Sequence, residues 1–357
     1  MSEESGSTVA LLRRRVLEDI SPASWEHPAD RVALQTLRAL PGFDLLVKRT
    51  LGLIGERGIR LMFQANAVRV EEDQFATLHR ALNEVKTTLD VRDDVPLFVS
   101  HAPWFNAGAY GVDKPFIVIN SGTLDLLDER ELRVLLAHEL GHVMSGHALY
   151  HTMLVLILSF GLRNLPLLAG IALVPIRLAL QEWSRKSELS ADRAGLLGSQ
   201  DPDAALSMFL KASGGSITTK HELNLAAYAR QVEEYEQHEG FDTVFKFLNL
   251  LDRSHPFHTL RAAELKRWGA GPECAKILAG EYRRRSEGRT ENYASDLSEA
   301  AGYYAGEARE RAREVTEMAR NIAQETTSRA KRAASEATEA ARHAVDRLSE
   351  AFGRRGQ

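Results

Sequence analysis

A segment of apolar residues at helical spacing, from Asp128 to Met144, places the strongest constraint on the fold of this 357-residue chain. Asp128 is a suitable helix cap, and the apolar residues after it are dense enough that we expect a buried helix. The same segment carries His138, Glu139 and His142. Two imidazoles and a carboxylate buried without partners are energetically costly. The fold must therefore supply this helix with polar partners or with a metal ion.

The spacing of the two histidines favours a metal ion. His138 and His142 are four positions apart, which puts both imidazoles on one face of a helix, one turn apart. Neutral imidazole is a good ligand for zinc, which prefers a tetrahedral ligand set. Glu139 can reach a water molecule at the metal without occupying the metal, as a general base must. A cluster of polar side chains that satisfy one another is the alternative.

A catalytic zinc ion needs a third protein ligand and one open position. The position that would hold a third histidine in an extended motif is Ala148. His147 and His151 follow His142 by five and nine residues. On a continuous helix both side chains would point away from the ligand face, so neither is a good candidate.

Glu188 and Asp192 are better candidates, because their spacing of four residues places them on one face of a second helix. Glu188 can bind zinc, and Asp192 can accept the outer N–H of a ligand histidine and thereby fix its tautomer. For Glu188 alone, a solvated carboxylate on a helix surface is the alternative.

Three separated segments together resemble the HtpX-like family of zinc metallopeptidases, which includes the CAAX prenyl endopeptidases. They are His138–His142, Glu188–Asp192 and His255–Arg261. The segment 106–111, followed by Ser121-Gly122, also resembles the substrate-binding edge strand of that family. The resemblance covers roughly residues 70–270, and four motifs in the family's order are far more specific than one.

The resemblance implies a zinc endopeptidase that acts on polypeptide substrates and holds one Zn²⁺ per chain. By this resemblance, the metal ligands are His138, His142 and Glu188, and Glu139 is the general base. His255 would stabilise the developing oxyanion, Asp192 and Arg261 would support the site, and Asn106, Ala107, Gly108 and Ala109 would pair with the substrate main chain. From the sequence alone, His255 is also compatible with a turn residue before a proline.

The chain departs from the family in two ways. It lacks the clean transmembrane span that many members have, and Gly108 stands where a bulky residue is frequent. The second difference leaves the shape of the substrate pocket open.

The wider pattern predicts an α+β fold, mostly helical, with a small sheet beside the active-site helix. Residues 97–99 and 116–119 are β-prone runs bounded by turn residues, and residues 72–90 show helical periodicity. The glycine-rich segment 106–111 is compatible with an edge strand or a loop. Residues 201–285 are expected to be helical, with a break at Ser254–Pro256.

Composition excludes several classes of protein. The net charge of -4 argues against a general nucleic-acid binder. The single cysteine, Cys274, excludes disulfides within the chain and a cysteine-based metal site. The first 16 residues lack the apolar stretch of a secretory signal. We therefore expect the catalytic part to face the cytoplasm, with association with the cytoplasmic face of a membrane left open.

Residues 152–180 are strongly apolar but are interrupted by Arg163, Pro166, Pro175 and Arg177. A spanning helix needs about 20 apolar residues. A short hairpin that enters one leaflet, an interfacial element and a lid on the protein are all compatible with this pattern. The tail after residue 285 shows a weak apolar stripe, mostly alanine, which favours a long amphipathic helix on a membrane or partner, or a solvated, partly disordered one.

These observations divide the chain into a loosely attached polar arm (1–41), a peptidase domain (42–285) with an apolar insertion (152–180), and a charged helical tail (286–357). The rival hypothesis is a non-catalytic scaffold that keeps the peptidase fold and binds through its tail. A scaffold would not need Glu139, which favours the enzyme. An aminopeptidase is a second rival, for which the sequence shows no separate amine-binding signal.

Overall fold

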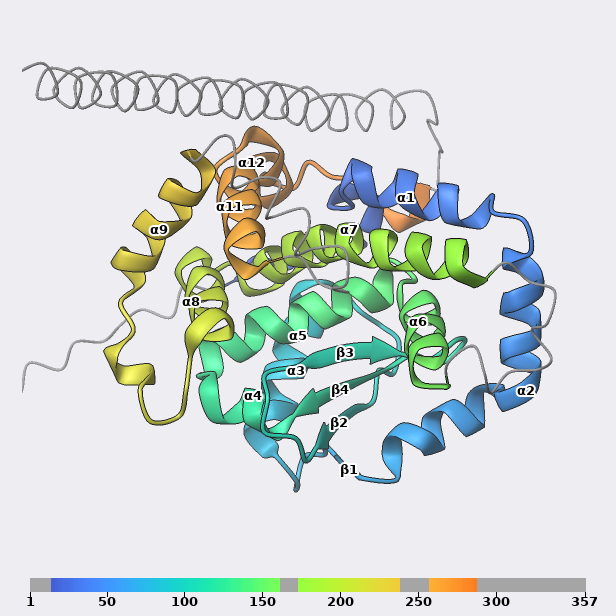
Figure 1. The fold of residues 1–357 in the computed structure, drawn as a ribbon. Coiled ribbons are helices and arrows are strands. Elements are labelled where there is room, and N and C mark those ends of the chain that lie inside the picture. The colour runs from blue at the N-terminus through green and yellow to red at the C-terminus, as the bar shows by residue number, and fades with distance from the viewer. Residues whose placement is uncertain (1–13, 161–172, 238–256, 288–357) are drawn as a thin grey trace, which may run out of the picture. The chain divides into compact units, whose positions relative to one another are not determined.

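The computed structural model describes residues 14–160, 173–237 and 257–287. All of these residues belong to one compact unit, drawn as the coloured ribbon in Figure 1. His255 and the tail predicted for residues 286–357 lie outside the described residues, apart from the 3₁₀ turn Arg285–Glu287 at the start of that tail.

The sheet has four strands in the order β1-β2-β4-β3 (Figure 1). The strands are β1 (Ala67–Arg69), β2 (Leu97–Ser100), β3 (Ala107–Tyr110) and β4 (Phe116–Asn120). Only β2 and β4 are parallel, so the sheet is mixed. The predicted strands β2 and β4 are confirmed, and the glycine-rich segment is the edge strand β3. The short strand β1 was not predicted, because three residues carry too little periodicity to detect.

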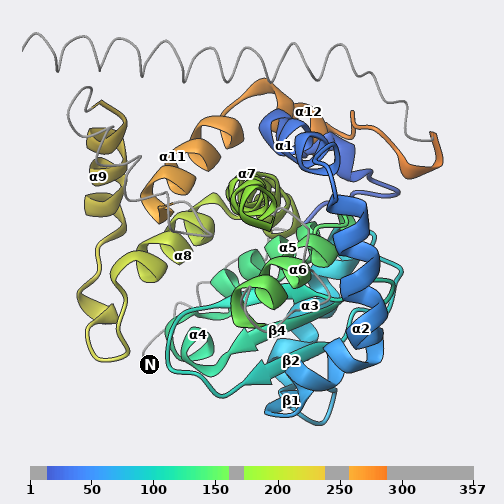
Figure 2. The same cartoon turned by 45° about the vertical axis from the view of Figure 1, so that its right-hand side comes forward.

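Two long helices form the centre of the molecule. Helix α5 (Glu129–Met144) begins with a capping box, in which Asp128 and Glu131 exchange side-chain and backbone hydrogen bonds. It packs against α7 (Leu173–Ser199) and α3 (Ala76–Thr88). Figure 2 shows α7 end on, with α5 on one side and α1 (Pro28–Arg38) and α12 (Pro272–Ala279) on the other. The predicted helices at 72–90 and around His138 are therefore confirmed.

Small residues let α5 and α7 approach closely. A Cβ atom added to Gly141 would lie 2.5 Å from the Cβ atom of Ala194, and one added to Gly198 would lie 2.5 Å from that of Ala137. Since carbon atoms in contact stay about 3.5 to 4 Å apart, neither glycine leaves room for a methyl group. The two backbones can thus lie closer than ordinary side chains would allow.

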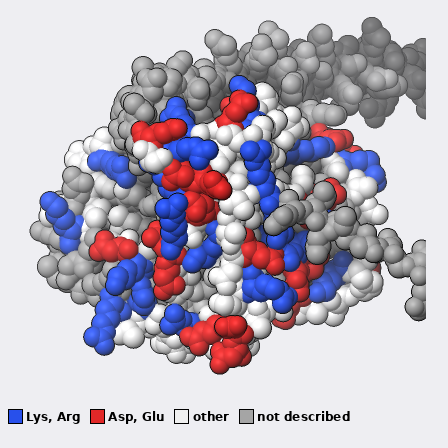
Figure 3. Space-filling model, turned by 180° about the vertical axis from the view of Figure 1, so that it is seen from behind, with Lys and Arg blue, Asp and Glu red and all other residues white. Residues whose placement is uncertain are grey.

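The remaining helices surround this centre. Helices α8 and α11 pack against each other, and α11 also contacts α7 and α9. Their bounds, with those of the other elements, are α1 (Pro28–Arg38), α2 (Phe43–Gln64), α4 (Ser121–Leu126), α6 (Ala148–Phe160), α8 (Pro202–Gly214), α9 (Leu225–Gln237), α11 (His258–Gly269) and α12 (Pro272–Ala279). On the face seen from behind in Figure 3, acidic and basic side chains are intermixed among the described residues.

The N-terminal segment differs from the expectation of a loosely attached arm. Trp25 and Leu37 are fully buried, and α1 packs along α7. Leu37 joins a core cluster with Trp183 of α7 and Tyr150 of α6. Residues 14–38 are therefore part of the folded unit that carries the site, and the domain boundaries at residues 41 and 285 remain a prediction.

No helix among the described residues is long and apolar enough to cross a membrane. The apolar region predicted at 152–180 includes most of α6 and the start of α7, and the residues between them, 161–172, are not described.

Candidate metal centre

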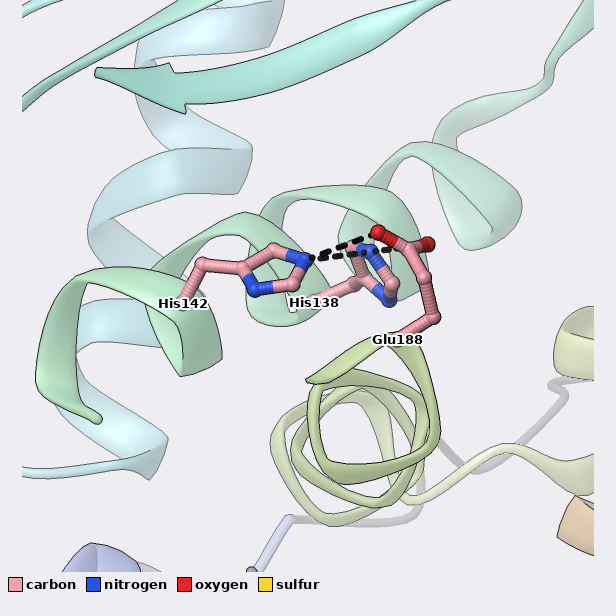
Figure 4. A group of neighbouring side chains, drawn as sticks. All are labelled: His138, His142 and Glu188. Atoms are coloured by element: carbon pink, nitrogen blue, oxygen red, sulfur yellow. Dashed lines mark hydrogen bonds and ion pairs between the residues drawn. The ribbon is translucent and has the colours of Figure 1, made fainter. Parts of the chain in front are cut away.

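The three predicted ligands meet between α5 and α7 (Figure 4). The Nε2 atoms of His138 and His142 are 3.2 Å apart, and they lie 3.6 and 3.5 Å from the two carboxylate oxygens of Glu188. All three residues are at least 96% buried, and one ligand atom from each lies within 4.8 Å of the others. Two imidazole nitrogens and a carboxylate oxygen that converge at this spacing fit one divalent metal ion such as zinc.

Asp192 and Arg261 hold two of the ligands in place. Asp192 Oδ1 lies 3.0 Å from Nδ1 of His138, so the opposite nitrogen of that ring is left for a metal. Arg261 donates from Nε and Nη2 to Asp192 at 2.9 and 2.6 Å, and its Nη1 lies 3.0 Å from Glu188. This buried guanidinium is thus the countercharge for two buried carboxylates.

The surroundings set the protonation of the ligands. Burial lowers the pKa of His142 to about 4, which favours the neutral ring that binds a metal. Burial also lowers the pKa of His138, but the hydrogen bond and charge of Asp192 outweigh burial, and the net pKa is raised. For Asp192, burial raises the pKa and the charge of Arg261 outweighs it, so the carboxylate stays ionised.

Glu139 lies beside the three ligands and is 3% exposed. The carboxylate accepts a hydrogen bond from the backbone N–H of Ala109 in β3, while its Oε2 atom has no hydrogen-bond partner in the described structure. Burial, together with the charge of Glu188, raises the pKa of Glu139 to about 7 against the opposing charges of His138 and Arg261. A carboxylate with a pKa near neutrality and one open oxygen is suited to proton transfer.

The ligands and Glu139 line a cavity of about 340 Å³. One wall is the segment Asn106–Gly108 with Tyr110, and the others come from α6, α8 and the start of α11. Away from the polar centre the walls are mostly apolar, formed by Phe105, Leu154, Val155, Leu158, Met208 and Phe209.

The outer edge of β3 faces this cavity. The backbone N–H of Asn120 donates to the carbonyl of Asn106 at 3.0 Å, and the register pairs Gly108 with Val118. Because hydrogen-bonded and non-hydrogen-bonded pairs alternate in an antiparallel ladder, the backbone polar groups of Ala107 and Ala109 point away from β4. The N–H of Ala109 is used by Glu139, so Ala107 offers the outward groups nearest the middle of the strand.

The open position of Gly108 is filled by a neighbouring side chain. A Cβ atom at Gly108 would lie 2.5 Å from the hydroxyl of Tyr110, two residues further along the strand. The Tyr110 ring stacks on Phe63 at a centroid distance of 4.3 Å. Burial raises the pKa of the Tyr110 hydroxyl, and Glu139 and Glu188 add to that shift. Tyr110 thus supplies bulk and a neutral hydroxyl where the sequence shows glycine.

The expectation that His147 and His151 point away from the site is wrong, because the helix is not continuous. Helix α5 ends at Met144, Gly146 has a φ of 73°, and α6 starts at Ala148. This turn brings Nδ1 of His147 to 3.0 Å from Nδ1 of His142. The ring centroid of His151 lies 4.6 Å from that of His142. The contact with His147 is made by Nδ1 of His142, whereas Nε2 of His142 faces the other ligands.

A further cavity residue that the sequence did not reveal is His258. It lines the cavity at the start of α11 and lies edge-on to Phe105, with ring centroids 6.2 Å apart. The signal was present, since His258 follows His255 by three residues, but no motif distinguished it. The structure brings together all the predicted site residues that it describes, whereas His255 lies outside the described residues.

A buried site of two histidines and a glutamate on paired helices, with a second glutamate at the cavity, is that of a metallopeptidase. Comparison with known proteins gives the same class. The model of peptidase family M48 matches residues 72–269. The chain is also 31% identical over 267 residues to plastoglobule-localized metallopeptidase 48, chloroplastic, of Arabidopsis thaliana, across 74% of this chain and 77% of that protein. The chain belongs to peptidase family M48.

Proposed function

We propose that this metallopeptidase is a zinc-dependent endopeptidase in which Glu139 is the general base. The observation that carries the proposal is the carboxylate of Glu139, which lines the cavity beside the three ligands and has one buried oxygen without a hydrogen-bond partner in the described structure. A bound zinc ion would polarise the scissile carbonyl and lower the pKa of a water molecule. Glu139 would take the proton of that water and later deliver it to the leaving amine.

The other residues hold these groups in position. Asp192 fixes the tautomer of His138, and Arg261 orients both Asp192 and Glu188. We assign the oxyanion contact to His255 on the strength of the family resemblance, with Arg261 further along the same segment.

The substrate would bind as an extended strand along the edge of β3. The outward backbone groups of Ala107 support this assignment, since a strand added to a sheet edge bonds through main-chain atoms. The apolar walls of the cavity would take apolar side chains of the substrate. Recognition through the main chain makes cleavage depend weakly on most substrate side chains.

The cavity favours an endopeptidase over an aminopeptidase. Among the described residues that line it, the carboxylates are Glu139 and Glu188. Both are needed for the metal chemistry, so no described carboxylate is left to bind a free α-amino group. A peptide blocked at its amino terminus should therefore be cleaved as well as an unblocked one.

Metal analysis combined with casein cleavage tests the proposal. The wild-type protein should contain about one zinc per chain, as expected for a single three-ligand site, and should cleave casein until a chelator removes the metal. Glu139→Gln should retain zinc and lose cleavage, because it removes the base but no ligand. A Glu139→Gln variant as active as wild type would refute the mechanism, and a zinc-loaded wild-type protein without activity would favour the scaffold.

We also propose that the protein works next to a lipid surface. Leu158 at the end of α6 and Leu178 in α7 are 47% and 50% exposed, and they flank the apolar residues 161–172. The name of the Arabidopsis relative places that protein at plastoglobules. Flotation with liposomes, for the full chain and for a chain ending after Glu287, tests this proposal. Flotation of both assigns the contact to residues 152–180, loss on truncation assigns it to the tail, and flotation of neither refutes it.

A further inference from the structure

Helix α1 places a buried carboxylate close to the metal centre. Asp30 is 1% exposed, and its Oδ2 atom lies 3.2 Å from Nε2 of His147. The same oxygen accepts a hydrogen bond of 2.6 Å from the Ser190 hydroxyl, and Oδ1 accepts one of 2.9 Å from the indole N–H of Trp183. Asp30 is therefore an acceptor fixed from three sides.

His147 connects this carboxylate to a metal ligand. It is 2% exposed, and its Nδ1 atom lies 3.0 Å from Nδ1 of His142. When Nε2 of His142 binds a metal, the ring must carry its proton on Nδ1, because a neutral imidazole has one protonated nitrogen. That N–H donates to Nδ1 of His147, which must then be unprotonated. The proton of His147 is consequently on Nε2 and points to Asp30.

We propose that Asp30 and His147 are positioning residues of the metal centre, which fix the orientation and tautomer of His142 through the chain Asp30–His147–His142. The inference rests on the proposed function, since it requires the metal ion at His138, His142 and Glu188. Each ligand histidine is then oriented by a carboxylate, directly or through a hydrogen-bonded neighbour. Asp192 contacts His138 directly, and Asp30 reaches His142 through one intervening imidazole.

The packing of α1 explains how a helix from the start of the chain can fill this role. His27 caps α1 by accepting from the N–H of Ala29, and its own backbone N–H donates to Ser190 at 2.8 Å. Leu37 is fully buried in the cluster that contains Trp183. Residue 30 lies outside the region matched by the family model, residues 72–269. The N-terminal segment thus contributes to this metal site from outside that region.

Zinc affinity of the full-length protein tests the proposal. The metal-free protein and its variants would be titrated with Zn²⁺ in competition with a chromophoric chelator. We expect Asp30→Asn and His147→Leu each to weaken zinc binding by about 10- to 100-fold, the usual effect of removing a partner of a ligand histidine. Thr36→Ala is the control, because it changes an exposed hydroxyl of the same helix α1 that donates to the carbonyl of Val32. Its zinc affinity should stay close to that of wild type.

The double variant separates positioning from a general loss of stability. If Asp30 acts through His147, adding Asp30→Asn to His147→Leu should cause little further loss of zinc affinity. The proposal would be overturned if the losses of zinc affinity in the two single variants multiplied in the double variant, or if Asp30→Asn bound zinc as tightly as wild type.

If Asp30→Asn does not fold when metal-free, His147→Asn is the test. Its amide oxygen can accept from His142 but loses the link to Asp30, so it should bind zinc more tightly than His147→Leu and less tightly than wild type. Equal affinity of His147→Asn and wild type would overturn the proposal, whereas absence of zinc binding in wild type would refute the proposed function itself.

Discussion

Replacing Gly141 with alanine should loosen the metal site without changing any ligand. The added methyl group would lie 2.5 Å from the Cβ atom of Ala194, where α5 packs against α7. Since carbon atoms in contact are about 3.5 to 4 Å apart, the two helices would have to separate by roughly 1 Å. His138 and His142 would move with α5, and Glu188 with α7.

The effect on metal binding should be larger than the effect on stability. Extra bulk in a packed core costs about 1–3 kcal/mol. The better helix propensity of alanine offsets about 1 kcal/mol of that cost. Ligand distances, in contrast, tolerate only about 0.2 Å, so a displacement of roughly 1 Å removes one ligand from the set. We therefore expect a folded Gly141→Ala protein whose zinc affinity falls by at least tenfold, comparable to the loss of a supporting partner.

Chelator competition and thermal unfolding of the metal-free protein would measure the two effects separately. The rescue variant Gly141→Ala with Ala194→Gly moves the methyl group from α7 to α5 and should restore zinc affinity. Ala194→Gly alone is the control, which should cost about 1 kcal/mol of helix stability and leave zinc affinity unchanged. Wild-type zinc affinity in Gly141→Ala, or no recovery in the rescue variant, would refute the argument that close helix approach sets the ligand geometry.

Three further predictions concern individual groups of the site. Glu188→Ala should abolish measurable zinc binding, whereas Asp192→Ala should weaken it by about 10- to 100-fold. A Glu188→Ala protein that metal analysis finds fully loaded with zinc would contradict the assignment of Glu188 as a ligand. His255→Phe should lower kcat with zinc still bound, and unchanged turnover of a good substrate would reduce His255 to a turn residue. Activity should fall on the acid side, because Glu139 must be ionised to accept a proton. Its pKa of about 7 without metal would be lowered by a nearby divalent cation. In a measurement from pH 5 to 9, kcat/KM should therefore begin to decline between pH 5 and 7 and approach a tenfold loss per pH unit on the acid side. A profile that is flat down to pH 5 with zinc retained would contradict this role for Glu139.

The ligand set could be predicted from the sequence because its information is local. His138 and His142 are one turn apart on one helix, and Glu188 and Asp192 are one turn apart on another. Pairing the two helices needed only the chemical requirement for a third ligand. Local rules also predicted β2 and β4, which are β-prone runs bounded by turn residues, and α3, whose apolar residues repeat with the period of a helix.

The surroundings of His142 could not be predicted, because they depend on where a helix stops. Apolar residues resume in α6 after the short segment Ser145–His147, and the positive φ of Gly146 turns the chain between the two helices. Once the chain turns, His147 faces back to His142 and meets Asp30 from α1. Nothing in the sequence near Asp30 indicates that partner, since an aspartate in the first turn of a helix is also common because it interacts favourably with the helix dipole.

The glycine at position 108 shows why the shape of a pocket is hard to infer from one position. Residues two apart on a strand project from the same face, so Gly108 and Tyr110 compete for one space beside the cavity. The hydroxyl of Tyr110 occupies the place where a Cβ atom at Gly108 would lie. A larger residue at 108 would have to displace this ring from its stack with Phe63. Bulk at 110 thus replaces bulk at 108, and the face of the strand, rather than either residue alone, determines how much room a substrate side chain finds next to Glu139.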